Sequence, residues 1–230
     1  MEVDQLTEWL WCLRTPVVRA YAVRDRDGFN LVDTSTAGED GAILDALRSV
    51  AGGDVKLADV LLTHGHDDHT GSAAALAVRT GARVIGPAGD AAVIMGERPA
   101  PPPDLAEWEV PIFAQVHPLV PPAPPVALDV RVDDAATLDW EHPARIIAAP
   151  GHTAGSVAVL FEDDGVLVTG DAIASFDGAP IVGVFNVDRA QATATFRQLA
   201  ALDVDIACFG HGAPLVGDAG ARLAEVAARL

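Results

Sequence analysis

Three of the seven histidines in this 230-residue chain lie within six residues, in the run His64-Gly65-His66-Asp67-Asp68-His69. The apolar stretch 60–62 directly before it predicts a buried strand, and the small apolar residues of 70–80 predict a helix that Gly81 ends. A loop between a strand and a helix is where α/β proteins place many of their ligand-binding groups. The run therefore favours a fold of alternating strands and helices and marks a candidate site.

The side chains of this run are of the metal-ligand type. Neutral imidazole nitrogens and carboxylate oxygens are donors that Zn²⁺, Fe²⁺ and Mn²⁺ accept. In an extended or tightly turned loop His64 and His66 point the same way, while Asp68 and His69 can turn toward a second metal ion. The run has no cysteine, the usual ligand of closed structural zinc sites, so an open, water-bearing site is favoured.

Three further donors follow strand-like stretches in the second half of the chain. They are His152 in Pro150-Gly151-His152, Asp171 in Thr169-Gly170-Asp171, and His211 in Gly210-His211-Gly212. The neighbouring glycines let the backbone turn tightly, so that each side chain can project over a sheet edge. Together with the first run they supply five histidines and two aspartates, the number needed to hold two metal ions with a bridging water.

Four other polar residues are weaker candidates. His117 and His142 match no motif and are expected at the surface or at the edge of the core. Asp67 and Asp33 each have two open interpretations: the carboxylate hydrogen-bonds a metal-binding imidazole, or it is a solvated loop carboxylate.

The alternation of patterns predicts an α/β (α+β) architecture, in one domain that spans residues 1–230. The turn 24–28 predicts a hairpin between the strands on either side of it, and the turn 163–165 predicts another. The stretches 60–62, 83–85, 127–132, 145–149 and 205–209 also have strand character. Helices are expected between 38 and 52, over 70–80, over 189–201 and at the C-terminal end.

The segment 99–125 contains ten of the 16 prolines. That density is too high for a helix or a central strand, because proline lacks the backbone N–H and clashes with the preceding helical turn. The segment is predicted to be either a structured insertion near the mouth of the site or a surface connection.

The charge balance limits the partners of the protein. With 33 acidic and 15 basic residues the formal net charge is −18, which disfavours binding to nucleic acid or to anionic lipid.

No apolar run approaches the roughly 18 residues that cross a bilayer, and the acidic start of the chain does not resemble a secretory signal. We expect a cytoplasmic protein with a small-molecule substrate and with two free, buried cysteines, Cys12 and Cys208. Its oligomeric state is left open.

The ordered motifs resemble those of the metallo-β-lactamase fold hydrolases. The likeness rests on 63–71, on Gly151-His152-Thr153-Ala154-Gly155-Ser156, on Gly170-Asp171 and on Gly210-His211-Gly212, and it extends from the opening strands to the last loop. It implies a four-layer αβ/βα sandwich. It also implies that one metal is bound by His64, His66 and His152, a second by Asp68, His69 and His211, and that Asp171 bridges them. The presence of Asp171 places the chain nearer the glyoxalase II-like branch than the true β-lactamases.

The implied activity is hydrolysis of an ester, thioester, lactone or related acyl bond. A water shared by two divalent metals, most simply Zn²⁺ with Fe or Mn as substitutes, ionises near neutral pH and would attack a polarised carbonyl. Asp68 is the expected residue for orienting that nucleophile and handling its proton. No Gly-x-Ser-x-Gly motif offers a serine nucleophile, and Phe176 and Phe185 suggest a partly apolar substrate.

Two alternatives stay open at this point. A persulfide-dioxygenase-like oxidoreductase would use the same fold with one iron held by two histidines and an aspartate. A non-catalytic protein would bind the metals without turnover. Neither needs all seven donors. Little positive charge follows His211, which disfavours a glutathione thioester as the substrate.

Overall fold

The computed structural model describes residues 1–230, and the chain divides into two compact units. The N-terminal unit comprises Met1–Ala100 and Val120–Val132, and the C-terminal unit comprises Pro101–Leu119 and Asp133–Leu230. Each unit contains one large sheet and its own helices, so the predicted mixed α/β class is confirmed. The assignment of 1–230 to a single domain stays a prediction.

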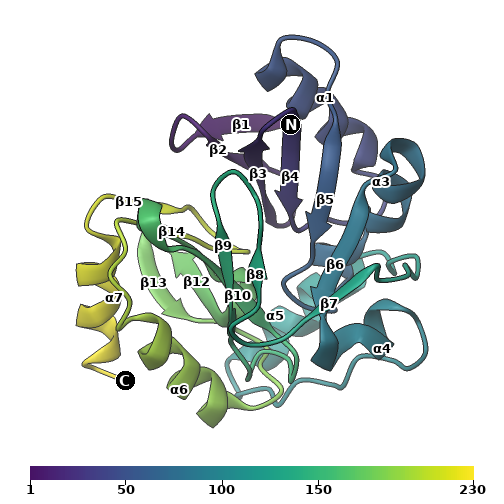
Figure 1. The fold of residues 1–230 in the computed structure, drawn as a ribbon. Coiled ribbons are helices and arrows are strands. Elements are labelled where there is room, and N and C mark those ends of the chain that lie inside the picture. Colours follow the sequence, from purple (N-terminus) through teal and green to yellow (C-terminus); the bar gives the residue numbers. More distant parts are fainter. The chain divides into compact units, whose positions relative to one another are not determined.

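The N-terminal unit is built on a seven-stranded sheet whose strand order follows the chain (Figure 1). The first four strands pair antiparallel, and β4 to β7 pair parallel. The predicted hairpin across 24–28 is therefore confirmed as β3 and β4. The strands are β1 (Glu2–Gln5), β2 (Leu10–Arg14), β3 (Arg19–Asp25), β4 (Gly28–Val32), β5 (Leu57–Leu61), β6 (Arg83–Pro87) and β7 (Val130–Val132).

Two helices, α1 (Asp40–Ala51) and α3 (Ala73–Thr80), pack their apolar sides on this sheet. Both end at a glycine with positive φ, Gly52 and Gly81, as the sequence predicts. The helix expected over 70–80 begins late, because the short α2 (Asp67–Thr70) comes first and Gly71 separates the two. A Cβ at Gly71 would lie 2.3 Å from the backbone nitrogen of Ala37, so this close approach requires glycine. A short turn, η1 (Ala88–Asp90), and α4 (Ala91–Ile94) follow β6.

The C-terminal unit has a six-stranded sheet in the order β15-β14-β11-β10-β9-β8. Helices α6 (Arg189–Leu199) and α7 (Ala219–Ala227) contribute Phe196, Leu199 and Leu223 to its core. The predicted hairpin across 163–165 is confirmed as β10 and β11, joined by η3 (Glu162–Asp164). The strands are β8 (Thr137–Leu138), β9 (Ala144–Ala148), β10 (Val157–Phe161), β11 (Val166–Val168), β14 (Ile206–Cys208) and β15 (Leu215–Val216).

A separate hairpin, not predicted from the sequence, lies after β11 in the C-terminal unit. The turn η4 (Gly170–Ala172) leads into β12 (Ile173–Phe176), which pairs antiparallel with β13 (Ala179–Val182). Phe176, one of the two phenylalanines that suggest a partly apolar substrate, is 67% exposed at the end of β12.

The proline-rich segment corrects one prediction, because it contains a helix. Helix α5 (Glu109–Val116) is followed by η2 (His117–Leu119), and both belong to the C-terminal unit. Pro111 is the third residue of α5, in the first turn, where a backbone N–H has no partner within the helix. The helix therefore loses no internal hydrogen bond to this proline.

Neither Cys12 nor Cys208 forms a disulfide bond, and both are buried, as predicted. No helix of the structure is both long enough and apolar enough to cross a membrane.

Candidate metal centre

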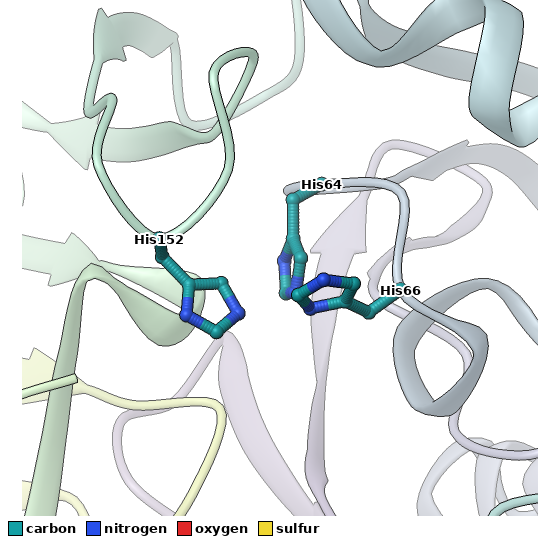
Figure 2. Close-up of side chains that lie close together, drawn as sticks. All are labelled: His64, His66 and His152. Atoms are coloured by element: carbon teal, nitrogen blue, oxygen red, sulfur yellow. The ribbon is translucent and has the colours of Figure 1, made fainter. Parts of the chain in front are cut away.

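His64 and His66 lie on the loop that leaves β5. Nε2 of His64 is 3.1 Å from Nδ1 of His66, and the two rings meet edge to face with centroids 4.8 Å apart (Figure 2). The ring of His69, at α2, lies beside that of His64, with centroids 4.2 Å apart. The loop therefore gathers three imidazoles at the carboxyl end of one strand, as the spacing predicts.

The rings of His64 and His69 are held through Nδ1. Nδ1 of His64 lies 3.0 Å from Oγ1 of Thr63, and Nδ1 of His69 lies 2.8 Å from Oδ2 of Asp33. A metal-binding histidine commonly has its second ring nitrogen fixed in this way by a hydroxyl, carboxylate or carbonyl group. The arrangement leaves Nε2 as the ligand atom of both rings.

Asp33 resolves one of the alternatives left open by the sequence. Its side chain is buried at the end of β4, where it accepts hydrogen bonds from the backbone N–H and the hydroxyl of Thr63, each at 2.8 Å. Its Oδ2 also contacts Nδ1 of His69. Asp33 is thus a support for a ligand imidazole and for the loop that carries His64, and not a solvated carboxylate.

Asp67 and Asp68 differ although they are adjacent. Asp67 is exposed and accepts a hydrogen bond from the backbone nitrogen of Ala123 at 3.0 Å, so it fixes the end of the proline-rich segment and supports no imidazole. Asp68 is half-buried, and its Oδ1 lies 4.0 Å from Nε2 of His69. Asp68 and His69 therefore place their ligand atoms on the same side of the loop.

Asp90 is a supporting residue that the sequence does not reveal. It is buried at the end of η1, and its Oδ2 accepts a hydrogen bond from the backbone nitrogen of Gly65 at 3.0 Å. Gly65 packs closely there, because a Cβ would lie 3.2 Å from Cγ1 of Val93. A lone aspartate 25 residues after Gly65 carries no motif, so only the folded structure relates it to the loop.

The C-terminal unit brings its three predicted ligands together. His152 follows β9, Asp171 lies in η4 after β11, and His211 follows β14. Oδ2 of Asp171 is 3.5 Å from Nε2 of His152 and 3.2 Å from Nε2 of His211. One carboxylate oxygen thus lies near the ligand nitrogens of two separate histidines.

The ring of His152 is also held through Nδ1, which lies 3.1 Å from the carbonyl oxygen of Val184 (Figure 2 shows the ring on its loop). Gly151 before it has φ +127 and contacts the start of α6 so closely that a Cβ would lie 2.2 Å from the nitrogen of Ala192. Glycine at this position is therefore required by the backbone itself.

His117 and His142 lie outside this arrangement, in line with the sequence. His142 pairs with Asp164 at 2.9 Å. His117 is exposed at the end of α5, where its ring packs against that of Phe113 with centroids 4.6 Å apart.

The donors have the chemistry of a site for borderline divalent metals. The residues that offer candidate ligand atoms are five histidines and two aspartates, with no cysteine: His64, His66, Asp68, His69, His152, Asp171 and His211. Imidazole and carboxylate donors of this kind suit zinc, iron and manganese.

Comparison with known proteins defines the class. The model of the metallo-β-lactamase superfamily matches residues 14–211, and the chain belongs to this superfamily. It is 34% identical over 169 residues to a hydroxyacylglutathione hydrolase of Acidiphilium cryptum, and the match covers 70% of this chain and 51% of that one. It is 28% identical over 210 residues to the probable metallo-hydrolase YflN of Bacillus subtilis, and that match covers 82% and 77% of the two chains.

The fold has close counterparts among solved structures. The metallo-β-lactamase family protein TTHA1429 of Thermus thermophilus has a TM-score of 0.70 and 25% identity, over 98% of this chain and 80% of that one. The predicted fold family is therefore confirmed. Membership of this family implies that the chain binds divalent metal ions. The chain spans about half the length of the hydroxyacylglutathione hydrolases that it matches.

Proposed function

We propose that the seven donors form one dinuclear metal centre. His64, His66 and His152 would hold the first metal, Asp68, His69 and His211 the second, and Asp171 would bridge the two. The observation that carries this proposal is the position of Asp171. Its Oδ2 lies 3.5 Å from Nε2 of His152 and 3.2 Å from Nε2 of His211, the two histidines assigned to different metals. A bridging carboxylate requires that relationship.

The proposed reaction is hydrolysis of an acyl bond, an ester, thioester or lactone. Bound divalent metals, with zinc as the first choice, supply Lewis acidity that lowers the pKa of water and polarises a carbonyl oxygen. The chain supplies the geometry and the proton path. Nε2 of His64 and of His69 is presented because Thr63 and Asp33 hold the opposite nitrogen of each ring.

Asp68 is the residue proposed to orient the attacking water and to handle its proton. It is the less buried of the two aspartate donors, with a side chain 17% exposed against 9% for Asp171. That partial exposure leaves a route from its carboxylate to solvent. A carboxylate within hydrogen-bond reach of a nucleophile can accept its proton and return it to the leaving group.

The proposed substrate is a small molecule with an apolar portion, and no nucleic acid or membrane partner is proposed. Phe113 of α5 and Phe185 contact each other edge to face, with centroids 5.1 Å apart. Phe185 adjoins Val184, whose carbonyl oxygen contacts His152. Two aromatic rings are therefore held close to the peptide group that contacts a proposed ligand. Because two relatives of the chain are named hydroxyacylglutathione hydrolase, a thioester is the first bond that we propose to test.

The test combines metal analysis with a substrate panel. Purified protein is analysed for zinc, iron and manganese, and assayed with thioesters, lactones, aryl esters and a chromogenic β-lactam. The expected result is two metals per chain, cleavage of at least one acyl substrate and little cleavage of the β-lactam. Binding of a single iron with oxygen uptake on persulfides would overturn the proposal. So would full metal loading with no hydrolysis across the panel.

Two variants localise the activity. Asp171→Ala should release at least one metal and reduce kcat by about 10²-fold or more, because the bridge and its charge are lost. His142→Ala is the matched control, a histidine paired with Asp164 in the same unit and outside the proposed site. Equal losses in both variants would remove Asp171 from the proposed bridge.

A further inference from the structure

A buried carboxylate from the proline-rich segment lies behind His152. Glu109, the first residue of α5, is fully buried and makes an ion pair at 2.7 Å with Nη2 of Arg189, the first residue of α6. Its two oxygens also accept hydrogen bonds from the backbone nitrogens of Ala106 at 2.8 Å and Phe185 at 3.0 Å. All of these groups belong to the C-terminal unit. The carboxylate therefore has hydrogen-bond donors on both oxygens.

One of these bonds ends on the peptide group that holds His152. The N–H of Phe185 and the carbonyl of Val184 are the two sides of a single planar peptide. Glu109 Oε1 accepts from the N–H, and the carbonyl oxygen lies 3.1 Å from Nδ1 of His152. A carbonyl can only accept, so this contact is a hydrogen bond when Nδ1 carries the proton. Nε2 then keeps its lone pair for a metal.

The backbone of this peptide is held in an uncommon conformation. Phe185 has φ +59, in the left-handed region that a bulky side chain rarely adopts. Such a conformation persists only where its surroundings fix it. The bond from Phe185 to Glu109 is one such constraint, and the contact between Phe185 and Phe113 of the same helix is another.

We propose that Glu109 is a positioning residue for His152, acting through the Val184–Phe185 peptide. A charged acceptor on the N–H polarises the peptide and strengthens the bond that its carbonyl accepts from Nδ1. In many metal sites a carboxylate accepts a hydrogen bond from the second ring nitrogen of a metal-binding histidine. Here the peptide group transmits the same effect from the carboxylate to the ring. Arg189 holds the carboxylate in place. The metal-affinity part of this inference rests on the proposed function, whereas the effect on the ring does not.

The first test needs no metal. In metal-free protein, ¹⁵N-detected NMR of the histidine rings measures which nitrogen of His152 carries the proton. Wild type should show the form protonated at Nδ1. Glu109→Ala should shift His152 toward a mixture of the two neutral forms, and Glu109→Gln, which keeps an oxygen acceptor without the charge, should fall between them.

The matched control is Asp59→Asn in the N-terminal unit. Asp59 is also a buried carboxylate with an arginine partner, since Arg83 Nε and Nη2 donate to it at 2.8 and 2.9 Å. Its loss should lower the melting temperature and leave the His152 ring signals unchanged. If Asp59→Asn moves those signals as far as Glu109→Ala does, general destabilisation explains the effect and the proposal is wrong.

The second test measures zinc affinity by competition with a chelator. Glu109→Ala should weaken the zinc that depends on His152 by about 10-fold, the lower end of the loss seen when supporting partners of metal ligands are removed. Glu109→Gln should lose less, and Asp59→Asn nothing. If Glu109→Ala does not fold, Glu109→Gln decides. Wild-type ring signals in Glu109→Gln, or in a folded Glu109→Ala, would overturn the proposal whatever metals the protein binds.

Discussion

Oδ2 of Asp33 lies 2.8 Å from Nδ1 of His69, with both side chains buried. Asp33→Asn should weaken the metal held by His69 by about 10- to 100-fold, because the carboxylate that orients the ring is lost. Asp33 has φ +61, a conformation that asparagine tolerates, so the substitution removes the charge without adding backbone strain. Metal content after dialysis against a chelator measures the effect.

The adjacent loop offers the control for Asp33→Asn. Asp67→Asn also removes one carboxylate, but Asp67 is exposed and contacts the backbone of Ala123 instead of an imidazole. Metal content in this variant should remain at the wild-type level. Equal depletion in both variants would mean that loss of negative charge near the loop, and not the contact with His69, controls binding.

A glycine between two ligands should be sensitive to a single methyl group. Gly65→Ala would place a Cβ 3.2 Å from Cγ1 of Val93, and overpacking of this kind costs about 1–3 kcal/mol in the free energy of unfolding. The displaced loop should also bind metal more weakly through His64 and His66. Urea unfolding of the metal-free protein and chelator competition measure the two effects.

The double variant Gly65→Ala/Val93→Ala tests the cause, because removing the valine methyls opens the space that the new Cβ needs. It should recover part of the lost metal affinity relative to Gly65→Ala alone. Gly53→Ala, where a Cβ meets nothing within 4 Å, should change neither measurement. Failure of the double variant to recover any affinity would show that Val93 is not the obstacle.

The local pattern predicts most of the ligand-bearing elements. β5, β9, β11 and β14 each appear as short apolar runs, and each precedes a proposed ligand, so strand ends could be located from the sequence. The predicted α1 is also correct, because Gly52 adopts the positive φ that ends a helix. In the N-terminal unit the predicted donors lie close together because they share one loop after β5. In the C-terminal unit they lie close together because β9, β11 and β14 run in the same direction, so that their carboxyl ends share a sheet edge.

The supporting groups could not be predicted in this way. Asp90 contacts Gly65 across 25 residues, and Glu109 contacts Phe185 across 76, so neither contact has a local signature. Helix α5 was missed for a related reason. Proline is tolerated in the first turn of a helix, so a high proline density excludes a helix only where the start of the helix cannot be located. In the folded chain the bonds of Glu109 to Ala106 and Arg189 fix where α5 begins.

Cys12 should be unreactive in the folded protein. Burial raises the pKa of its thiol to about 11, against the opposing charge of Arg19, so almost no thiolate forms at a pH of about 8. A chromogenic disulfide reagent should therefore modify neither Cys12 nor the equally buried Cys208 within minutes, and should modify both in urea. Rapid modification of the folded chain at that pH would contradict this environment for one of the two thiols.

Glu109 should make stability depend on pH in the acid range. Burial alone would raise the pKa of its carboxyl, but the hydrogen bonds from Arg189, Ala106 and Phe185 outweigh it and hold the pKa below the ordinary value of 4.5. The unfolded chain therefore binds this proton more readily than the folded one, so the stabilisation is complete above about pH 4.5 and is lost as the pH falls through the folded-state value.

The difference in unfolding free energy between wild type and Glu109→Gln, measured in urea on metal-free protein, should be constant from about pH 7 to about pH 5. It should then shrink with further acidification. If the difference in unfolding free energy grows below about pH 4.5, the folded state favours the protonated carboxyl. That outcome would contradict the ionised Glu109 that the ion pair with Arg189 implies.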